Sequence, residues 1–387
     1  MQRALLFKLM DNTSEPRMPD QTDRDLPTVV EVDQFMPSFV SGGMGGTETY
    51  ARQVFNVLNE LPGVSVCAVL PQGSEDFAST GTSKVMPLAA VSATTAGRLK
   101  RMLEVLLRRR KLYSLLRDSA VTFVPFTTPL LPVRKLSPVV ITFHDVQHRE
   151  LPELFSRFEK VYRYFTYERP ARQADHIITV SEYAKQSIVR ELRINPSRIT
   201  AIPLGVDTSS FTPNLGEREN FVYYPARGWL HKNHQRLIEA MEIVRQTHPE
   251  LRLVLTGGAL DSLGDLPEWV DNRGLVSFTE VQELFQKAKV LAFPSLYEGF
   301  GFPPLEAMAS GTPVAASTAA SIPEICGDAV VYFNPFDVDS IAEGILAAIN
   351  DRDRLVPLGL ERVKQFTWEK CAKRHAEVFR RVAHDGN

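Results

Sequence analysis

Cysteine is scarce and long apolar runs are absent, and both shortages limit what the protein can be. The three cysteines, Cys67, Cys326 and Cys371, lie far apart with no C-x-x-C spacing, so neither a disulfide framework nor a zinc site is expected. No apolar run is long enough to span a bilayer. The apolar part of the N-terminus is too short for a signal peptide, so the cytoplasm is the expected compartment.

Neither sign of charge dominates, and two common nucleotide-binding motifs are missing. The 44 Lys and Arg residues nearly balance the 46 Asp and Glu residues, whereas nucleic-acid-binding domains are strongly basic, so no nucleic-acid partner is expected. No G-x-G-x-x-G follows a predicted strand, which argues against an NAD-dependent dehydrogenase, and no Walker A loop is present. Asp-x-Asp triplets at 23–25, 337–339 and 351–353 do not follow buried strands, so no metal–diphosphate site is expected.

The chain is long enough for two packed domains, with 387 residues of which 44% are hydrophobic. Apolar strand-like runs alternate with helix-like segments, and this pattern occurs twice, on either side of a joint near Gly205. Such alternation is typical of parallel sheets covered on both faces. We therefore predict an α/β protein with two doubly wound domains, divided into a lead-in (1–27), an N-terminal domain (28–205), a C-terminal domain (206–366) and a C-terminal helix (367–387) that packs back on the N-terminal domain.

Helix starts are indicated by side chains that can cap them. Ser181 precedes the helical segment "EYAKQSIVREL" and is predicted to be its N-cap. Thr279 and Gln282 have the spacing of a capping pair, so a helix is predicted to begin at Thr279.

Two glutamates bracket a Gly-Phe-Gly turn in the stretch "SLYEGFGFPPLEAMASGTPVAAS", which lies between two predicted strands. Pro303 and Pro304 suit the first turn of a helix. Glu298 then lies in the loop after a strand and Glu306 near the start of that helix, at the edge of the sheet where ligands bind. Carboxylates can accept hydrogen bonds from the neighbouring hydroxyls of a sugar or ribose. An acid–base pair and a helix-capping Glu306 are the alternatives.

Three further loops carry candidate ligand-binding residues. Gly45 and Gly46 lie in "SGGMGGTE" before a helix, which suits an anion, although a plain flexible loop fits equally. Arg227 and Lys232 follow the strand "NFVYYP", and two cations there suit a diphosphate better than a solvated loop. His144 follows the strand "PVVITF" and either orients a substrate or transfers a proton, or merely ends the strand.

The spacing E-x7-E from Glu298 to Glu306 resembles the signature of retaining GT-B glycosyltransferases of glycosyltransferase family 4. The resemblance covers nearly the whole chain after residue 28 and includes the glycine-rich loop, "FHD", "ADHIITVSEYAK", "IPLGVD", the Arg227 and Lys232 pair, and "VVYFNPFDVDSIAEGI". It implies a GT-B fold, in which two Rossmann-like domains face a central cleft. A nucleotide-sugar epimerase of the same architecture and a binding module without transfer are the competing interpretations.

The family resemblance also implies roles for individual residues. Arg227 and Lys232 would hold the donor diphosphate, Glu306 the ribose hydroxyls, and Glu298 the hydroxyls of the transferred sugar. His144 would lie over the donor sugar near the reacting carbon. The remaining donor-binding residues are backbone contributors: Gly45, Gly46, Gly258, Gly299, Phe300, Gly301 and Phe302. No metal and no cofactor other than the nucleotide-diphosphate sugar are expected.

The acceptor side is less defined in the sequence. The segment 97–117 has eight cations against Glu104, and its apolar residues, expected to share one face, are Leu99, Met102, Leu103, Leu106, Tyr113 and Leu116. Such a helix either lies on an anionic membrane surface or packs on the core with a solvated basic side. The segment 148–172 either lines an acceptor cleft or is a packed helix. The family's common membership favours transfer of mannose from GDP, with a UDP-hexose as the other donor, to a saccharide or lipid-linked acceptor in cell-surface polysaccharide or glycolipid synthesis.

Overall fold

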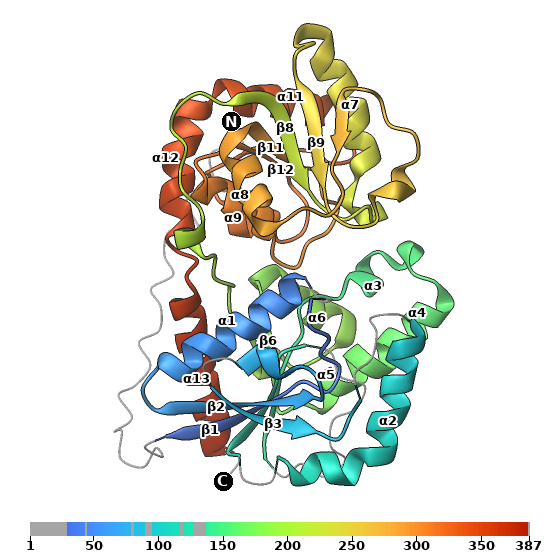
Figure 1. Ribbon diagram of the computed structural model, residues 1–387, viewed down its shortest axis with the longest axis vertical. Helices are drawn as coiled ribbons and strands as arrows, with labels where there is room; N and C mark the ends of the chain where they lie inside the picture. Colours follow the sequence, from blue (N-terminus) through green and yellow to red (C-terminus); the bar gives the residue numbers. More distant parts are fainter. Residues whose placement is uncertain are drawn as a thin grey trace, which may run out of the picture.

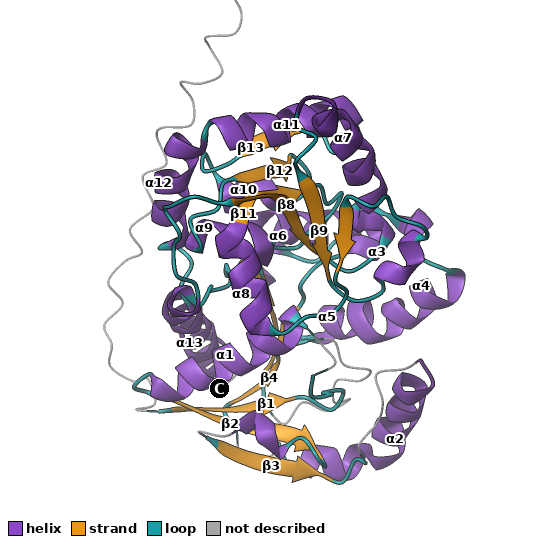
Figure 2. Ribbon diagram, turned by 45° about the horizontal axis from the view of Figure 1, so that its top comes forward, coloured by secondary structure: helices purple, strands orange, loops and turns teal. Residues whose placement is uncertain are grey.

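The computed structural model describes residues 29–42, 45–78, 81–89, 95–116, 119–126 and 137–385. The lead-in 1–27 and the middle of the glycine-rich loop, residues 43–44, lie outside the described residues. Two parallel sheets, each flanked by helices, form two domains that face each other (Figure 1; Figure 2). The predicted fold class is therefore confirmed.

The first sheet has seven strands in the order β3-β2-β1-β4-β5-β6-β7. Its strands are rich in Val and Ile and are mostly buried, as expected for a sheet covered on both faces. The chain builds outward from β1 in one direction and then returns to add β4 on its other side. The bounds are β1 (Val30–Phe35), β2 (Val64–Pro71), β3 (Thr82–Met86), β4 (Val121–Val124), β5 (Val139–Thr142), β6 (His176–Thr179) and β7 (Ile199–Ala201).

The second sheet has six strands in the order β10-β9-β8-β11-β12-β13. Its direction also reverses once, between the neighbouring strands β8 and β11. A reversal of this kind leaves a crevice at the carboxyl ends of the two central strands, where ligands of doubly wound folds bind. The bounds are β8 (Glu219–Pro225), β9 (Arg252–Thr256), β10 (Val270–Asn272), β11 (Ala288–Phe293), β12 (Val314–Ser317) and β13 (Val331–Phe333).

Helices connect the parallel strands, as crossover connections require. Those of the first domain are α1 (Gly46–Glu60), α2 (Thr95–Ser114), α3 (Gln147–Glu150), α4 (Arg157–Arg163), α5 (Arg169–Gln173) and α6 (Glu182–Leu192). Those of the second are α7 (His234–Thr247), α8 (Phe278–Lys287), α9 (Phe302–Ala309), α10 (Ile322–Cys326), α11 (Val338–Asn350) and α12 (Arg352–Val363), and the chain ends in α13 (Trp368–Asp385).

Of the two predicted helix starts, one is confirmed and the other is wrong. Ser181 caps α6, because its hydroxyl accepts a hydrogen bond from the Ala184 N–H at 3.1 Å. The prediction that Thr279 caps the helix that follows β10 is wrong. That helix, α8, begins one residue earlier, and its N-cap is Ser277, whose hydroxyl accepts from the Glu280 N–H.

The predicted apolar face of the 97–117 helix is also wrong in part. Leu116 is buried as predicted, but Leu103 is 57% exposed and Leu106 40% exposed, whereas Leu112, which was not placed on that face, is buried. Arg101, counted among the cations, is instead buried and paired with Glu104. The sequence periodicity separates two faces of this helix. In the structure the face that carries Arg101 packs against the core. No helix within the described residues is long and apolar enough to cross a membrane.

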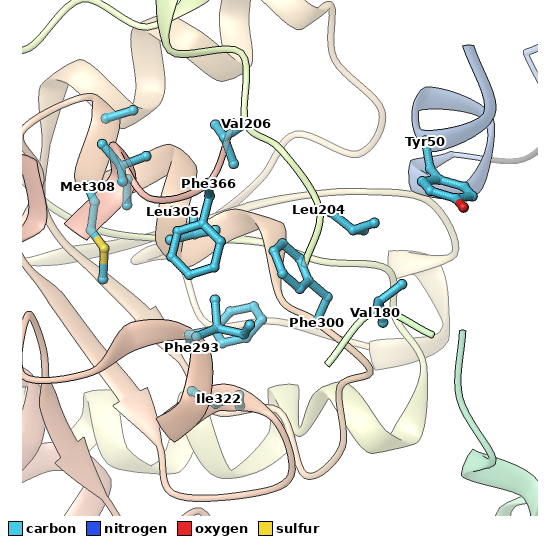
Figure 3. Packing of buried hydrophobic residues seen from close by; sticks show 14 of the residues in the cluster. Tyr50, Val180, Leu204, Val206, Phe293, Phe300, Leu305, Met308, Ile322 and Phe366 are labelled. Carbon is cyan, nitrogen blue, oxygen red and sulfur yellow. The ribbon is translucent and has the colours of Figure 1, made fainter. Parts of the chain in front are cut away.

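The last helix and one buried cluster connect the two domains. Helix α13 runs from the second domain along the first, where it packs against α1, β1 and β4 (Figure 1). The same hydrophobic cluster contains Val180 and Leu204 from the first half of the chain and Phe300 from the second (Figure 3). Phe300 contacts the ring of Phe366, with centroids 5.8 Å apart. Burying one such ring stabilises a protein by about 2 to 3 kcal/mol. Because the cluster takes side chains from both halves of the chain, its burial stabilises the contact between the domains.

Candidate active site

The predicted ligand-binding residues gather at the switch point of the second sheet. Arg227 follows β8 and Glu298 follows β11, the two strands between which the strand order reverses. Pro303 and Pro304 lie in the first turn of α9, as predicted. Glu306 is the fifth residue of this eight-residue helix, further from its start than the sequence indicated.

Lys232 and Glu298 form a close ion pair. Lys232 Nζ lies 2.6 Å from Glu298 Oε1, and both side chains are largely buried. The short 3-10 turn Leu230–Lys232 carries the lysine, and the Tyr224 hydroxyl donates to the Lys232 carbonyl at 2.7 Å. The cation and the carboxylate neutralise each other. A ligand with both a phosphate and a hydroxyl group can engage the two separately.

Arg227 lies at the same edge but without an ion-pair partner among the described residues. Its side chain is exposed, and its guanidinium lies over the Trp229 ring, 5.3 Å from the centroid. A Cβ atom placed on Gly45 would lie 3.9 Å from the guanidinium. The glycine-rich loop of the first domain therefore approaches the free cation of the second.

Glu306 differs from Glu298 because its carboxyl group has no hydrogen-bond or ion-pair partner among the described residues. Burial raises its pKa from 4.5 to about 7. An unpaired carboxyl group in such surroundings favours a ligand that donates hydrogen bonds to it, because those bonds compensate for the lost water.

The loop between the two glutamates touches the first domain. A Cβ atom on Gly299 would lie 2.8 Å from the His144 carbonyl oxygen, so a larger residue would force the two loops apart. The Ser181 hydroxyl donates to the Gly299 carbonyl at 2.7 Å. Gly301 has a φ of 111°, which allows the turn into α9. The rings of Phe300 and Phe302 meet edge-on with centroids 5.5 Å apart, Phe300 buried in the core and Phe302 partly buried against it.

His144 is neutral at physiological pH, because burial lowers the pKa of its ring. Its Nε2 atom lies 3.2 Å from the Pro125 carbonyl oxygen. A carbonyl only accepts, so we assign the ring hydrogen to Nε2, which leaves Nδ1 as an acceptor. The Tyr50 ring packs edge-on against the imidazole with centroids 5.1 Å apart.

A buried hydrogen-bond chain behind His144 was not predicted. The Tyr50 hydroxyl lies 2.7 Å from the Thr142 hydroxyl and 2.8 Å from His375 Nε2. His375 comes from α13, and its Nδ1 atom lies 2.8 Å from the Cys371 carbonyl. Burial lowers the pKa of His375 to about 4, so the ring is a neutral acceptor for Tyr50. Helix α13 thereby holds α1 beside His144.

Glu324 is a second residue that sequence reasoning missed. Its carboxylate oxygens accept hydrogen bonds from the Glu182 and Tyr183 N–H groups at 2.8 and 2.9 Å. These groups open α6 of the other domain, so Glu324 caps a helix 140 residues away and adds to the domain contact. No local pattern signals a cap supplied from so far along the chain.

The remaining glycines lie at the same edge. Gly46 begins α1, and a Cβ atom on it would lie 3.4 Å from the Phe302 ring. The Gly258 carbonyl accepts from the Gly228 N–H at 3.0 Å, which ties the loop after β9 to the loop after β8. Within the described ranges, no three His, Cys, Asp or Glu side chains are close enough to hold a metal ion.

The chain matches two family descriptions in succession. Residues 44–210 match "Glycosyltransferase Family 4" and residues 206–360 match "Glycosyl transferases group 1". Together they cover the first domain from the glycine-rich loop onward and most of the second.

Similar proteins agree with this match. O-antigen chain mannosyltransferase B of Escherichia coli is 28% identical over 270 residues, which are 64% of this chain and 71% of that protein. The MMP alpha-(1->4)-mannosyltransferase of Mycolicibacterium hassiacum is 30% identical over 285 residues, 66% of this chain and 68% of that protein. Sucrose-phosphate synthase from Thermosynechococcus elongatus has the same fold, with a TM-score of 0.72 at 19% identity, over 92% of this chain and 100% of that one. The chain therefore belongs to the GT-B glycosyltransferases of glycosyltransferase family 4.

Proposed function

We propose that this glycosyltransferase moves a hexose, mannose in first place, from a nucleotide sugar to a saccharide or lipid-linked acceptor, with retention at the anomeric carbon. The observation that carries this proposal is the gathering of two cations and two carboxylates at the switch point of the second sheet. The mannosyltransferase names of both relatives support the choice of sugar. Synthesis of cell-surface polysaccharide or glycolipid is the corresponding process.

The donor side follows from the charges at this edge. Arg227 and Lys232 bind the diphosphate, where negative charge builds as the bond to the sugar breaks, and fixed cations stabilise that charge. Binding of the phosphate releases Glu298 from Lys232, and the carboxylate then accepts from sugar hydroxyls. Glu306, which has no hydrogen-bond or ion-pair partner among the described residues, accepts from the ribose. In this proposal the cations suffice, and no metal ion takes part.

The acceptor side uses the first domain. His144 lies beside the loop of Glu298, and its neutral ring offers Nδ1 to a sugar hydroxyl. In a retaining reaction the acceptor attacks from the face that the diphosphate leaves, and the departing phosphate takes the acceptor proton. Gly45 and Gly46 close onto the phosphates or the acceptor from the end of α1. Peripheral membrane contact through residues 97–117 stays a prediction, for which exposed Leu103, Leu106 and Leu107 are the available apolar surface.

The test is a thermal-shift panel with UDP, GDP, ADP and dTDP and their sugar conjugates, followed by NMR of the products. We expect GDP and GDP-mannose to stabilise the protein and slow hydrolysis of the donor to give free mannose of retained configuration. No stabilisation by any nucleotide would overturn the assignment of the diphosphate and ribose sites. Appearance of an epimeric donor without any acceptor would instead support the nucleotide-sugar epimerase.

A further inference from the structure

A pocket lies in the first domain, outside the switch-point site. It has a volume of about 510 Å³ and is formed by α3, α4, the turn that follows α4, and the end of α6. This volume is in the range of small-molecule sites. None of the residues assigned to the donor lines it.

The floor of the pocket is a buried carboxylate with three donors. Glu168 accepts from His148 Nε2 at 2.9 Å and from Arg149 Nε and Nη2 at 2.7 Å each. These bonds outweigh burial and lower the pKa of Glu168 to about 2. Because a carboxylate only accepts, the hydrogen of His148 is on Nε2. The other ring nitrogen, Nδ1, is buried with no hydrogen-bond partner among the described residues.

The wall of the pocket is aromatic and exposed. Tyr164 and Phe165 are 44% and 45% exposed, and their rings meet edge-on with centroids 5.2 Å apart. They lie in the π-helical turn Tyr164–Glu168. Turns of this kind are rare and are frequent at functional sites. Here the turn presents two aromatic rings to the pocket and still brings Glu168 inward.

The charges of the lining residues sum to zero. Arg149 and Lys160 contribute two positive charges, and Glu168 and Glu191 contribute two negative ones. A phosphate in the pocket would meet both carboxylates, so an anion is disfavoured. A neutral molecule with hydroxyl groups on its edges and an apolar face fits both the aromatic wall and the mixed donors and acceptors. Sugars have this character.

The pocket borders the active site. Helix α3 begins three residues after His144. Burial lowers the pKa of His231, next to Lys232, to about 4, and the charges of Lys232, Glu298, Asp145 and Arg163 also act on it. Asp145 lies just before α3 and Arg163 is the last residue of α4, so the α3–α4 segment faces the donor side of the second domain.

We propose that this pocket binds a neutral saccharide unit of the acceptor glycan, stacked on the exposed rings of Tyr164 and Phe165. The assignment of the saccharide to the acceptor rests on the proposed function. The assignment of the pocket as a carbohydrate site rests on the pocket alone.

Saturation-transfer NMR without donor tests the pocket directly. The probes are α-linked mannotriose and trisaccharides of glucose, galactose and N-acetylglucosamine. We compare the wild type with the double variant Tyr164→Ala and Phe165→Ala, whose exposed positions should not disturb folding. Phe158→Ala is the matched control, because Phe158 is 55% exposed on α4, the helix that leads into the π-helical turn, but does not line the pocket. We expect at least one trisaccharide to bind, with a dissociation constant about tenfold higher in the double variant and unchanged in Phe158→Ala.

Several results would overturn the proposal. They are the absence of binding by every trisaccharide, equal binding by the double variant, and an equal loss in Phe158→Ala. Displacement of the trisaccharide by inorganic pyrophosphate would show an anion site instead. Thermal shift with GDP, run on the same proteins, separates the two proposals. Loss of nucleotide binding together with intact glycan binding would refute the donor assignment and leave the carbohydrate site standing.

Discussion

The four charged residues of the candidate active site form a paired half, Lys232 and Glu298, and an unpaired half, Arg227 and Glu306. Lys232 and Glu298 lie 2.6 Å apart and neutralise each other, whereas Arg227 and Glu306 have no ion-pair partner among the described residues. A paired charge is already stabilised and has to be released by the ligand, while an unpaired one gains directly from binding. The paired half is thus suited to the junction of sugar and diphosphate, where contacts change as the bond breaks, and the unpaired half to holding the nucleotide.

The largest effect is expected from breaking the paired half. Glu298→Ala should lower kcat by about a thousandfold, because it removes the sugar contact and leaves Lys232 buried without its carboxylate. The nucleotide dissociation constant should change by less than about threefold. Steady-state kinetics and calorimetry with GDP measure the two quantities. Wild-type turnover would refute the role given to Glu298.

The next effect concerns the unpaired cation. Arg227→Ala should weaken nucleotide binding by about 10- to 100-fold, because a charge-assisted contact to phosphate is lost. Arg245→Ala is the matched control, since Arg245 also lies over a tryptophan ring, 5.2 Å from the Trp269 centroid, but away from the switch point. Calorimetry with GDP measures the nucleotide affinity of both variants. An affinity of Arg227→Ala equal to that of Arg245→Ala would contradict the diphosphate assignment.

The unpaired carboxyl group should make nucleotide binding depend on pH. Glu306 ionises with a pKa of about 7, and the ionised form is the better acceptor for ribose. Between pH 6 and 8 the ionised fraction rises about tenfold, so affinity for GDP should rise by up to about tenfold relative to Glu306→Gln. The phosphates of GDP titrate in the same way with both proteins, so comparison with the variant cancels their contribution to the pH dependence. A parallel pH dependence in both proteins would argue against a ribose contact.

The same group should also affect stability, with a definite sign. Because its pKa is raised on folding, the folded protein binds the proton more tightly than the unfolded chain. The free energy of unfolding of the wild type should therefore fall, relative to Glu306→Gln, as the pH rises from 4.5 to about 7. The difference is up to about 3 kcal/mol at pH 8. Urea unfolding at pH 5 and pH 8 measures it, and no difference between the two proteins would show that the carboxyl group is well solvated.

The smallest effect is expected from removal of metal ions. If Arg227 and Lys232 stabilise the leaving diphosphate, transfer should continue unchanged in EDTA. Activity that is lost in EDTA and restored by magnesium or manganese would mean that the cations alone do not suffice.

Much of the fold was predictable, because local patterns encode it. Apolar runs such as "AKVLAF" became buried parallel strands, and Pro303 and Pro304 began a helix where a missing N–H is harmless. The position of Arg227 and Glu298 at one edge of the second sheet was predictable for the same reason. Each lies in the loop after a strand, and in a parallel sheet the carboxyl ends of strands meet at one edge. Their role in binding a donor stays a prediction.

The pairings within the site were not predictable, because they join residues far apart in the chain. The Lys232–Glu298 contact spans 66 residues, and the Tyr50–His375 contact spans 325. Spacing along a sequence shows which residues share an element, but not which distant element lies opposite. For α2 even the buried face was misjudged, since periodicity separates two faces without showing which one meets the core.

By itself the sequence determined two doubly wound domains and the strand edge that carries Arg227, Lys232, Glu298 and Glu306, because strand runs and loop residues are local properties. The tertiary structure alone decided which of those charges have an ion-pair partner among the described residues, how α13 supports His144, and that Tyr164, Phe165 and His148 line one pocket. Each of these depends on packing between distant segments, where burial and partner, and not residue type, decide the chemistry of a side chain.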